Sequence, residues 1–139
     1  YLFGKDVVHQ FAMMKVLIWE YQLEDMVKIS NYTKKPLVEF GKSKASLLTS
    51  KYEGFGLTIM ESIEVGCPVL SYDVRYGPNE IINHGKNGYL IERNNIDSLA
   101  QHMVDIIENP MQHVKNQDKL KYSAAVKNYQ HLLQTFNLL

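Results

Sequence analysis

Two glutamates flank a glycine-rich turn in the middle of this 139-residue chain. In the segment EGFGLTIMES, Glu53 and Glu61 enclose Gly54 and Gly56. A helix is predicted to begin near Leu57, and the first turn of a helix carries unpaired N–H groups and the positive end of the helix dipole. The glycines leave the backbone open to a ligand at that point. The spacing therefore indicates an anion-binding site, and phosphate is the anion that such sites usually bind.

The two carboxylates suggest what the phosphate is attached to. Glu61 lies one turn into the predicted helix, where it can accept two hydrogen bonds from a vicinal diol. Glu53, on the loop side, can do the same for a second hydroxylated group. A phosphate between two polyols describes a nucleotide sugar, with its ribose, diphosphate and hexose. The alternative is structural: the dipole alone favours a glutamate near a helix start, and glycines are common turn residues.

Short apolar runs alternate with helical periodicity along the chain. Strands are predicted at residues 1–4, 26–30, 45–50, 68–74 and 88–91. Helices are predicted at residues 8–22, 37–43, 57–65 and 78–82, and from Asn95 or Asp97 to a stop at Pro110. The first helix places Phe11, Met14, Leu17, Ile18 and Tyr21 on one face. This alternation predicts an α/β fold, a three-layer αβα Rossmann-like arrangement around one parallel sheet of five strands.

Parallel sheets of this kind bind ligands beyond the carboxyl ends of their strands. Residues 31–34, 49–58 and 73–78 each follow a predicted strand. We therefore expect these three segments to meet at one edge. Arg75 and Tyr76 either line the resulting cleft or form a solvated turn.

Composition narrows the class of protein. The chain has 15 Lys and Arg against 15 Asp and Glu, so it lacks the surplus of basic residues that would indicate a nucleic acid partner. We expect no transmembrane segment, because no apolar run is long enough to span a bilayer. A single cysteine, Cys67, excludes an internal disulfide and is interpreted as a small buried residue. The length predicts one domain over 1–139, with a helical tail from about 112.

Two other classes of site are disfavoured. We expect no metal, because the chain has neither an Asp-x-Asp cluster nor an H-E-x-x-H spacing among its histidines. A dinucleotide oxidoreductase would need G-x-G-x-x-G after a strand, and GFGLTI has Ile59 at the third position.

The segment SKYEGFGLTIMESIEVGCPVLSYDV resembles the donor site of retaining glycosyltransferases of the GT-B architecture, in particular their large family four. The matching residues are Ser50, 53–57, Glu61, Gly66, Pro68 and Val69. The resemblance covers about residues 1–110, because YLFG, LEDMVKISNYT, ASLLTS, HGKNGYLI and DSLAQHMVDIIENP follow in family order. DVRYGPNEII is similar to poly(glycerol-phosphate) alpha-glucosyltransferases of wall teichoic acid and to N-acetylglucosaminyltransferases of serine-rich proteins.

The resemblance implies a role for each matching residue. Glu53, the catalytic candidate, would face the hydroxyls of the donor hexose, and Glu61 would hold the ribose diol. Backbone N–H groups would reach the sugar and the diphosphate from Phe55, Gly56, Leu57 and Thr58. Tyr32 and Thr33 would border the base, beside Asn31, which stands where many relatives have glycine.

The resemblance also implies a metal-independent hexosyltransferase that uses a UDP-linked sugar as substrate, needs no cofactor, and acts on a cell-surface polymer or protein. The chain would be the N-terminally truncated C-terminal half of a GT-B fold. It would lack the acceptor-binding domain and an upstream Arg and Lys that grip the diphosphate, so we expect it to be inactive alone. The expected location is the cytoplasm, at the inner face of the membrane, with any membrane association made by the missing part. The alternative is an inactive binding or chaperone subunit, against which the two intact glutamates argue.

Overall fold

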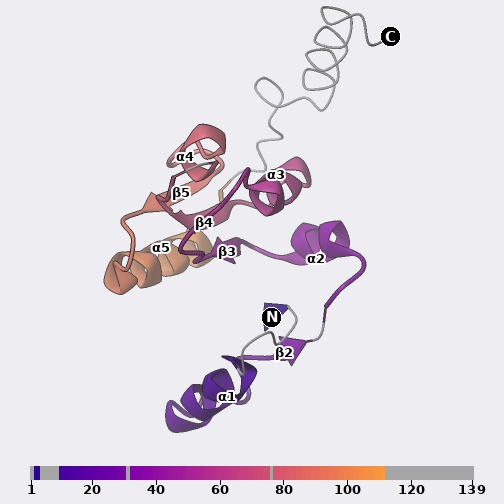
Figure 1. Cartoon of the computed structure of the whole chain (residues 1–139), viewed down its shortest axis with the longest axis vertical. Helices are drawn as coiled ribbons and strands as arrows, with labels where there is room; N and C mark the ends of the chain where they lie inside the picture. The colour runs from indigo at the N-terminus through magenta and orange to yellow at the C-terminus, as the bar shows by residue number, and fades with distance from the viewer. Residues whose placement is uncertain (1, 4–9, 31, 76, 112–139) are drawn as a thin grey trace, which may run out of the picture. The chain divides into compact units, whose positions relative to one another are not determined.

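A computed structural model describes residues 2–3, 10–30, 32–75 and 77–111 (Figure 1). The chain separates into two compact units, residues 1–36 and 37–139, and each is described by itself. The predicted tail from about 112 lies outside the described residues, as do Asn31 and Tyr76. No helix in the described ranges is long and apolar enough to cross a membrane.

The first unit is a strand–helix–strand segment. Strands β1 (Leu2–Phe3) and β2 (Ile29–Ser30) pair in parallel, and helix α1 (Gln10–Glu20) connects them. Phe11, Met14 and Ile18 lie on the half-buried face of α1, as predicted. The same prediction is wrong for Leu17 and Tyr21, which are exposed. Tyr21 lies beyond the helix, which ends at Glu20, and the chain turns at Gln22 with a φ of 54°.

The second unit is built on a three-stranded parallel sheet. Strand β3 (Ser46–Leu48), strand β4 (Val69–Tyr72) and strand β5 (Gly88–Ile91) lie in the order β3-β4-β5. Leu47 pairs with Leu70, which in turn pairs with Tyr89. The parallel α/β architecture is therefore confirmed. The described strands form a two-stranded sheet in the first unit and a three-stranded sheet in the second, and a single sheet of five remains a prediction.

Helices cover both faces of the second sheet, and β4 is buried throughout (Figure 1). On one face Val69 packs with helix α3 (Leu57–Glu64), through Ile59 and Ile63, and with the short helix α4 (Pro78–Ile81). On the other face Leu70 and Tyr72 pack with Ile106 of helix α5 (Ile96–Glu108). Alternate residues of β4 thus supply two cores, which is the three-layer arrangement predicted.

The helix boundaries follow local chemistry. Helix α2 (Pro36–Lys42) begins at a proline, whose missing N–H costs nothing in a first turn. Helix α3 ends before Gly66, which has a φ of 80° and lets the chain reverse into β4. Helix α5 is capped by Asn95, whose Oδ1 accepts a hydrogen bond from Ser98 N at 3.0 Å. Asn95, and not Asp97, is therefore the cap.

Candidate donor-binding site

The start of helix α3 is an open helix end. Gly56 occupies the cap position with φ 74° and ψ 35°, and no side chain caps the helix. Its carbonyl oxygen accepts hydrogen bonds from the N–H groups of Ile59 and Met60, at 3.0 and 3.1 Å. Within the described residues the N–H groups of Gly56, Leu57 and Thr58 donate no hydrogen bond. Leu57 and Thr58 are exposed, so their amides are available to a ligand.

The two glycines of the turn have different roles. A Cβ at Gly56 would lie 2.9 Å from Ile81 Cδ1, and the left-handed backbone there disfavours any side chain. A Cβ at Gly54 would meet nothing within 4 Å. Packing and conformation therefore require glycine at position 56 only, and a side chain at position 54 would enter open space beside the turn.

The loops after β3 and β4 lie directly against each other. Gly77, which precedes α4, has a φ of 97°, and a Cβ there would lie 3.0 Å from the Phe55 carbonyl and 3.2 Å from Gly56 N. Gly56 and Gly77 are both buried at this contact. The expected meeting of segments 49–58 and 73–78 at one edge is therefore found, and it requires glycine in both loops.

The two glutamates stand on either side of the open helix end. Glu61 is exposed and shares a face of α3 with Leu57 and Thr58, because residues three and four apart on a helix are neighbours. Glu53 is half-buried in the loop before the helix. Neither carboxylate accepts a hydrogen bond or forms an ion pair with another described residue. Both are therefore available to ligand hydroxyls, as their predicted roles require.

The predicted base contacts belong to the other unit. Tyr32 and Thr33 follow β2, and Thr33 Oγ1 accepts a hydrogen bond from Lys35 N at 3.1 Å. The ring of Tyr32 is exposed. Their approach to a ligand held at α3 remains a prediction.

A buried chain of hydroxyl groups, which was not predicted from the sequence, connects α3 to the sheet. Ser62, which follows Glu61, is fully buried, and its Oγ donates to the Cys67 carbonyl oxygen at 3.0 Å. That donation uses the only Ser62 hydroxyl proton, so Ser46 Oγ in β3 donates to Ser62 Oγ at 2.7 Å. Cys67 is buried as predicted, and burial raises the pKa of its thiol, which disfavours the reactive thiolate.

A second contact that the sequence did not reveal crosses the end of β4. The Arg93 guanidinium, after β5, lies 5.7 Å from the ring centroid of Tyr52, which follows β3. Such a contact stabilises an exposed pair by about 0.5–1 kcal/mol. It ties the loop that carries Glu53 to the far edge of the sheet. Arg75 is exposed in the loop between them.

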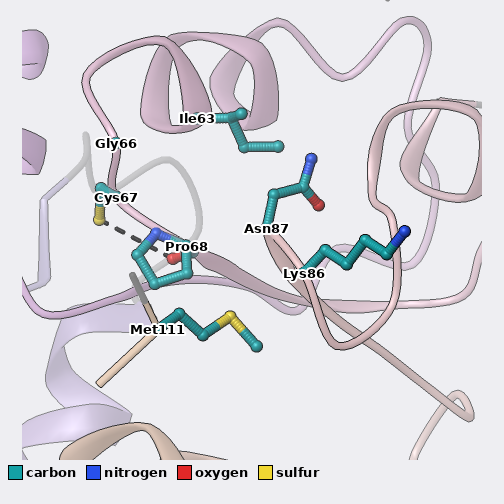
Figure 2. Close-up of a pocket in the computed structure, with 7 residues that line it drawn as sticks. All are labelled: Ile63, Gly66, Cys67, Pro68, Lys86, Asn87 and Met111. Carbon is teal, nitrogen blue, oxygen red and sulfur yellow. Dashed lines mark hydrogen bonds between the residues drawn. The ribbon is translucent and has the colours of Figure 1, made fainter. Parts of the chain in front are cut away.

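The hollow in Figure 2 lies at the opposite edge of the sheet. Cys67 and Pro68, just before β4, line it together with Ile63, Lys86, Asn87 and Met111. The side chain of Asn87 is already engaged, since its Oδ1 accepts from Asn83 N and its Nδ2 donates to the Ile81 carbonyl. Among the described residues no group of three or more His, Cys, Asp or Glu could hold a metal ion. The candidate site is therefore the edge at α3.

Known proteins resemble this chain along most of its length. The family described as glycosyl transferases group 1 matches residues 8–127. A poly(glycerol-phosphate) alpha-glucosyltransferase of Bacillus subtilis is 38% identical over 114 residues, which are 82% of this chain and 17% of the relative. The GtfA subunit of a UDP-N-acetylglucosamine–peptide N-acetylglucosaminyltransferase of Streptococcus pneumoniae is 33% identical over 97 residues, which are 70% of this chain and 18% of the relative.

A solved structure agrees with these matches. A mutant of Staphylococcus aureus TarM, in complex with fondaparinux, alpha-GlcNAc-glycerol and UDP, superposes with a TM-score of 0.70. The two proteins are 35% identical, and the match covers 78% of this chain and 22% of that one. The chain thus spans less than a quarter of each of these relatives. Both resemblances inferred from the sequence, the broad family and the narrower group, are confirmed.

Proposed function

Because this chain belongs to the glycosyl transferases group 1 family, we propose that it forms the donor-binding domain of a retaining glycosyltransferase. The enzyme would transfer a hexosyl unit from a nucleotide sugar to a cell-surface polymer or protein. The relatives act, by their names, on a poly(glycerol-phosphate) and on a peptide, which supports this class of acceptor. The acceptor would bind to a separate domain of the same protein.

The open end of α3 is the observation on which the proposal rests. Helix α3 follows the cap residue Gly56, and the amides of Leu57 and Thr58 are unpaired among the described residues, so the helix start offers N–H donors and a positive dipole end to an anion. A diphosphate fits that chemistry. The UDP in the TarM complex supports a uridine nucleotide as the carrier.

The glutamates would orient the two ends of the donor. Glu61 would accept hydrogen bonds from the ribose diol, and Glu53 from hydroxyls of the hexose, each a charge-assisted contact. Amides at the start of α3 would stabilise the charge that develops on the departing diphosphate. The donor is a substrate in this scheme, and neither a metal nor a cofactor is needed. We assign no covalent nucleophile.

We place the enzyme in the cytoplasm, at the inner face of the membrane. A single cysteine suits a reducing compartment, and a polymer or surface protein under construction would be reached from that side. Attachment to the membrane would come from parts of the protein other than these residues.

Replacement of Glu61 tests the proposal. In the complete protein, Glu61→Gln should weaken UDP binding by about 1.5–3 kcal/mol, because the amide loses the charge that strengthens bonds from the diol. Glu64→Gln is the matched control, because Glu64 is an exposed glutamate of the same helix that lies three residues further from the helix start than Glu61. Titration calorimetry should separate the two variants. Equal UDP affinity in Glu61→Gln and the parent would remove Glu61 from the site.

Activity with a panel of nucleotide sugars decides between this proposal and the inactive-subunit alternative. A transferase should hydrolyse or transfer at least one sugar. Nucleotide binding with no turnover of any donor would instead favour a binding or chaperone subunit.

A further inference from the structure

The hydrogen bonds of Ser46 and Ser62 form a closed ring that joins α3, β3 and the segment before β4. Ser46 Oγ donates to Ser62 Oγ at 2.7 Å, and Ser62 Oγ donates to the Cys67 carbonyl oxygen at 3.0 Å. The ring is closed by Ser46 N, which donates at 2.9 Å to the carbonyl oxygen of Pro68, the next residue in the chain. All four residues belong to the second unit, so the ring is a property of that unit alone.

The Ser62 side of the ring is held twice. Besides the bond from its side chain, the Ser62 carbonyl oxygen accepts a hydrogen bond from Cys67 N at 3.0 Å. Ser62 is 0% exposed, so bulk water does not compete for its hydroxyl, which both accepts and donates within the ring. Buried polar groups that are satisfied in this way favour a single arrangement of the segments that carry them.

The ring supplies what the apolar contacts of α3 cannot. Ile59 and Ile63 pack with Val69 and so attach the helix to the sheet, but hydrophobic burial has no preferred direction. A hydrogen bond, in contrast, weakens steeply when its distance or angle changes. Because Ser62 is bonded both to β3 and to the segment before β4, α3 cannot slide or rotate on the sheet without loss of a bond.

The anchored residue is close to the candidate site along the helix. Ser62 directly follows Glu61, and Leu57 lies five residues earlier, which is about 7.5 Å along a helix. A helix this short moves as one body, so a shift at Ser62 carries over to the carboxylate and to the open amides of the first turn. Misplacement of a binding group by about 1 Å can cost about a hundred-fold in rate.

We propose that Ser46 and Ser62 are positioning residues of the donor site. Their hydroxyls fix the register of α3 on the sheet, and the helix in turn holds Glu61 and the amides of its first turn where the donor needs them. This inference rests on the proposed function, because that function assigns these groups to the donor. It adds that the place of the groups is set by two hydroxyls that make no contact with the donor.

Ser46 is the informative position for a test, because it cannot reach the ligand itself. It begins β3, whereas the candidate site lies beyond Leu48, two residues and about 6.6 Å further along the strand. Ser46→Ala removes the bond between strand and helix and leaves the backbone bond to Pro68 in place. Ser46→Thr keeps the hydroxyl, and threonine is favoured in strands. Any effect of these variants on UDP must therefore pass through α3.

Titration calorimetry with UDP on the complete protein measures the effect. We expect Ser46→Ala to bind UDP about five-fold more weakly, because the displaced helix end makes poorer contacts to the diphosphate and the diol. Ser46→Thr should bind UDP within about two-fold of the parent. Ile106→Val is the control for stability: it shortens a side chain in the core on the other face of the sheet, and it should lower the Tm without weakening UDP binding.

Each contrary outcome is distinct. Unchanged UDP affinity in Ser46→Ala would overturn this inference while the proposed function stands, since the protein would still bind UDP. Equal weakening in Ile106→Val would mean that loss of stability alone explains the effect, and failure of Ser46→Thr to restore binding would mean that the hydroxyl is not responsible; either would overturn the inference. A parent protein that binds no UDP would refute the proposed function and this inference with it.

Discussion

Helices α3 and α5 begin differently, although each follows a strand at the same edge of the same sheet. At α5 the Asn95 side chain accepts a hydrogen bond from Ser98 N, and a cap of this kind is worth about 0.5–2 kcal/mol. At α3 the cap residue is Gly56, which has no side chain, and the amides of Leu57 and Thr58 have no partner among the described residues. In the proposed function, the capped start of α5 serves stability, whereas the uncapped start of α3 serves the binding of a ligand.

The largest effect is expected when the isolated 139-residue chain is compared with the complete protein in UDP binding and sugar transfer. An open helix end can bind a diphosphate, but transfer needs donor and acceptor held together in a cleft that excludes water. We expect the isolated chain to fold marginally, to bind UDP at least about a hundred-fold more weakly than the complete protein, and to turn nothing over. Sugar transfer by the chain at a rate near that of the complete protein would show that the active site is misplaced.

Closing the open end should abolish activity in the complete protein. Gly56→Val places a branched side chain at a φ of 74° and against Ile81, so the turn must shift away from its ligand geometry. We expect transfer to fall by about a hundred-fold or more with most of the circular dichroism spectrum retained. Gly54→Ala is the control, since a Cβ there meets no atom within 4 Å. Comparable activity in the two variants would defeat the special role of Gly56.

Removing the cap of α5 should have the smallest effect, and on a different property. Asn95→Ala leaves Ser98 N without its acceptor and should lower the free energy of unfolding by about 1 kcal/mol. UDP affinity should not change. Denaturant titration and calorimetry on the same preparation check both statements. Weaker UDP binding in this variant would mean that the two helix ends do not differ in function.

The sequence predicted the elements that repeat a simple pattern. Alternating strands and helices, the parallel pairing, the burial of Cys67 and the glycine turn before α3 follow from periodicity and turn chemistry. The end of α1 could not be predicted in this way, because Tyr21 fits the helical period and yet lies beyond the last helical residue, Glu20, where it is exposed. Periodicity locates a helix face but does not locate the helix end.

Contacts between distant residues could not be predicted in the same way. The chain of hydroxyls from Ser46 through Ser62 to the Cys67 carbonyl forms only because α3 packs on the sheet next to β3. The Arg93–Tyr52 contact spans the end of β4. No local pattern marks these residues, since serines, tyrosines and arginines at such spacings are usually solvated. Tertiary packing alone brings them together.

Amide chemical shifts test the central claim most directly. In the complete protein labelled with nitrogen-15, UDP should shift the amide signals of Leu57 and Thr58, which are unpaired among the described residues, and leave that of Ser98, which Asn95 caps. The Leu57 and Thr58 shifts should saturate at the same UDP concentration as the heat of binding. UDP that binds with no change at Leu57 and Thr58, or with equal change at Ser98, would contradict the account.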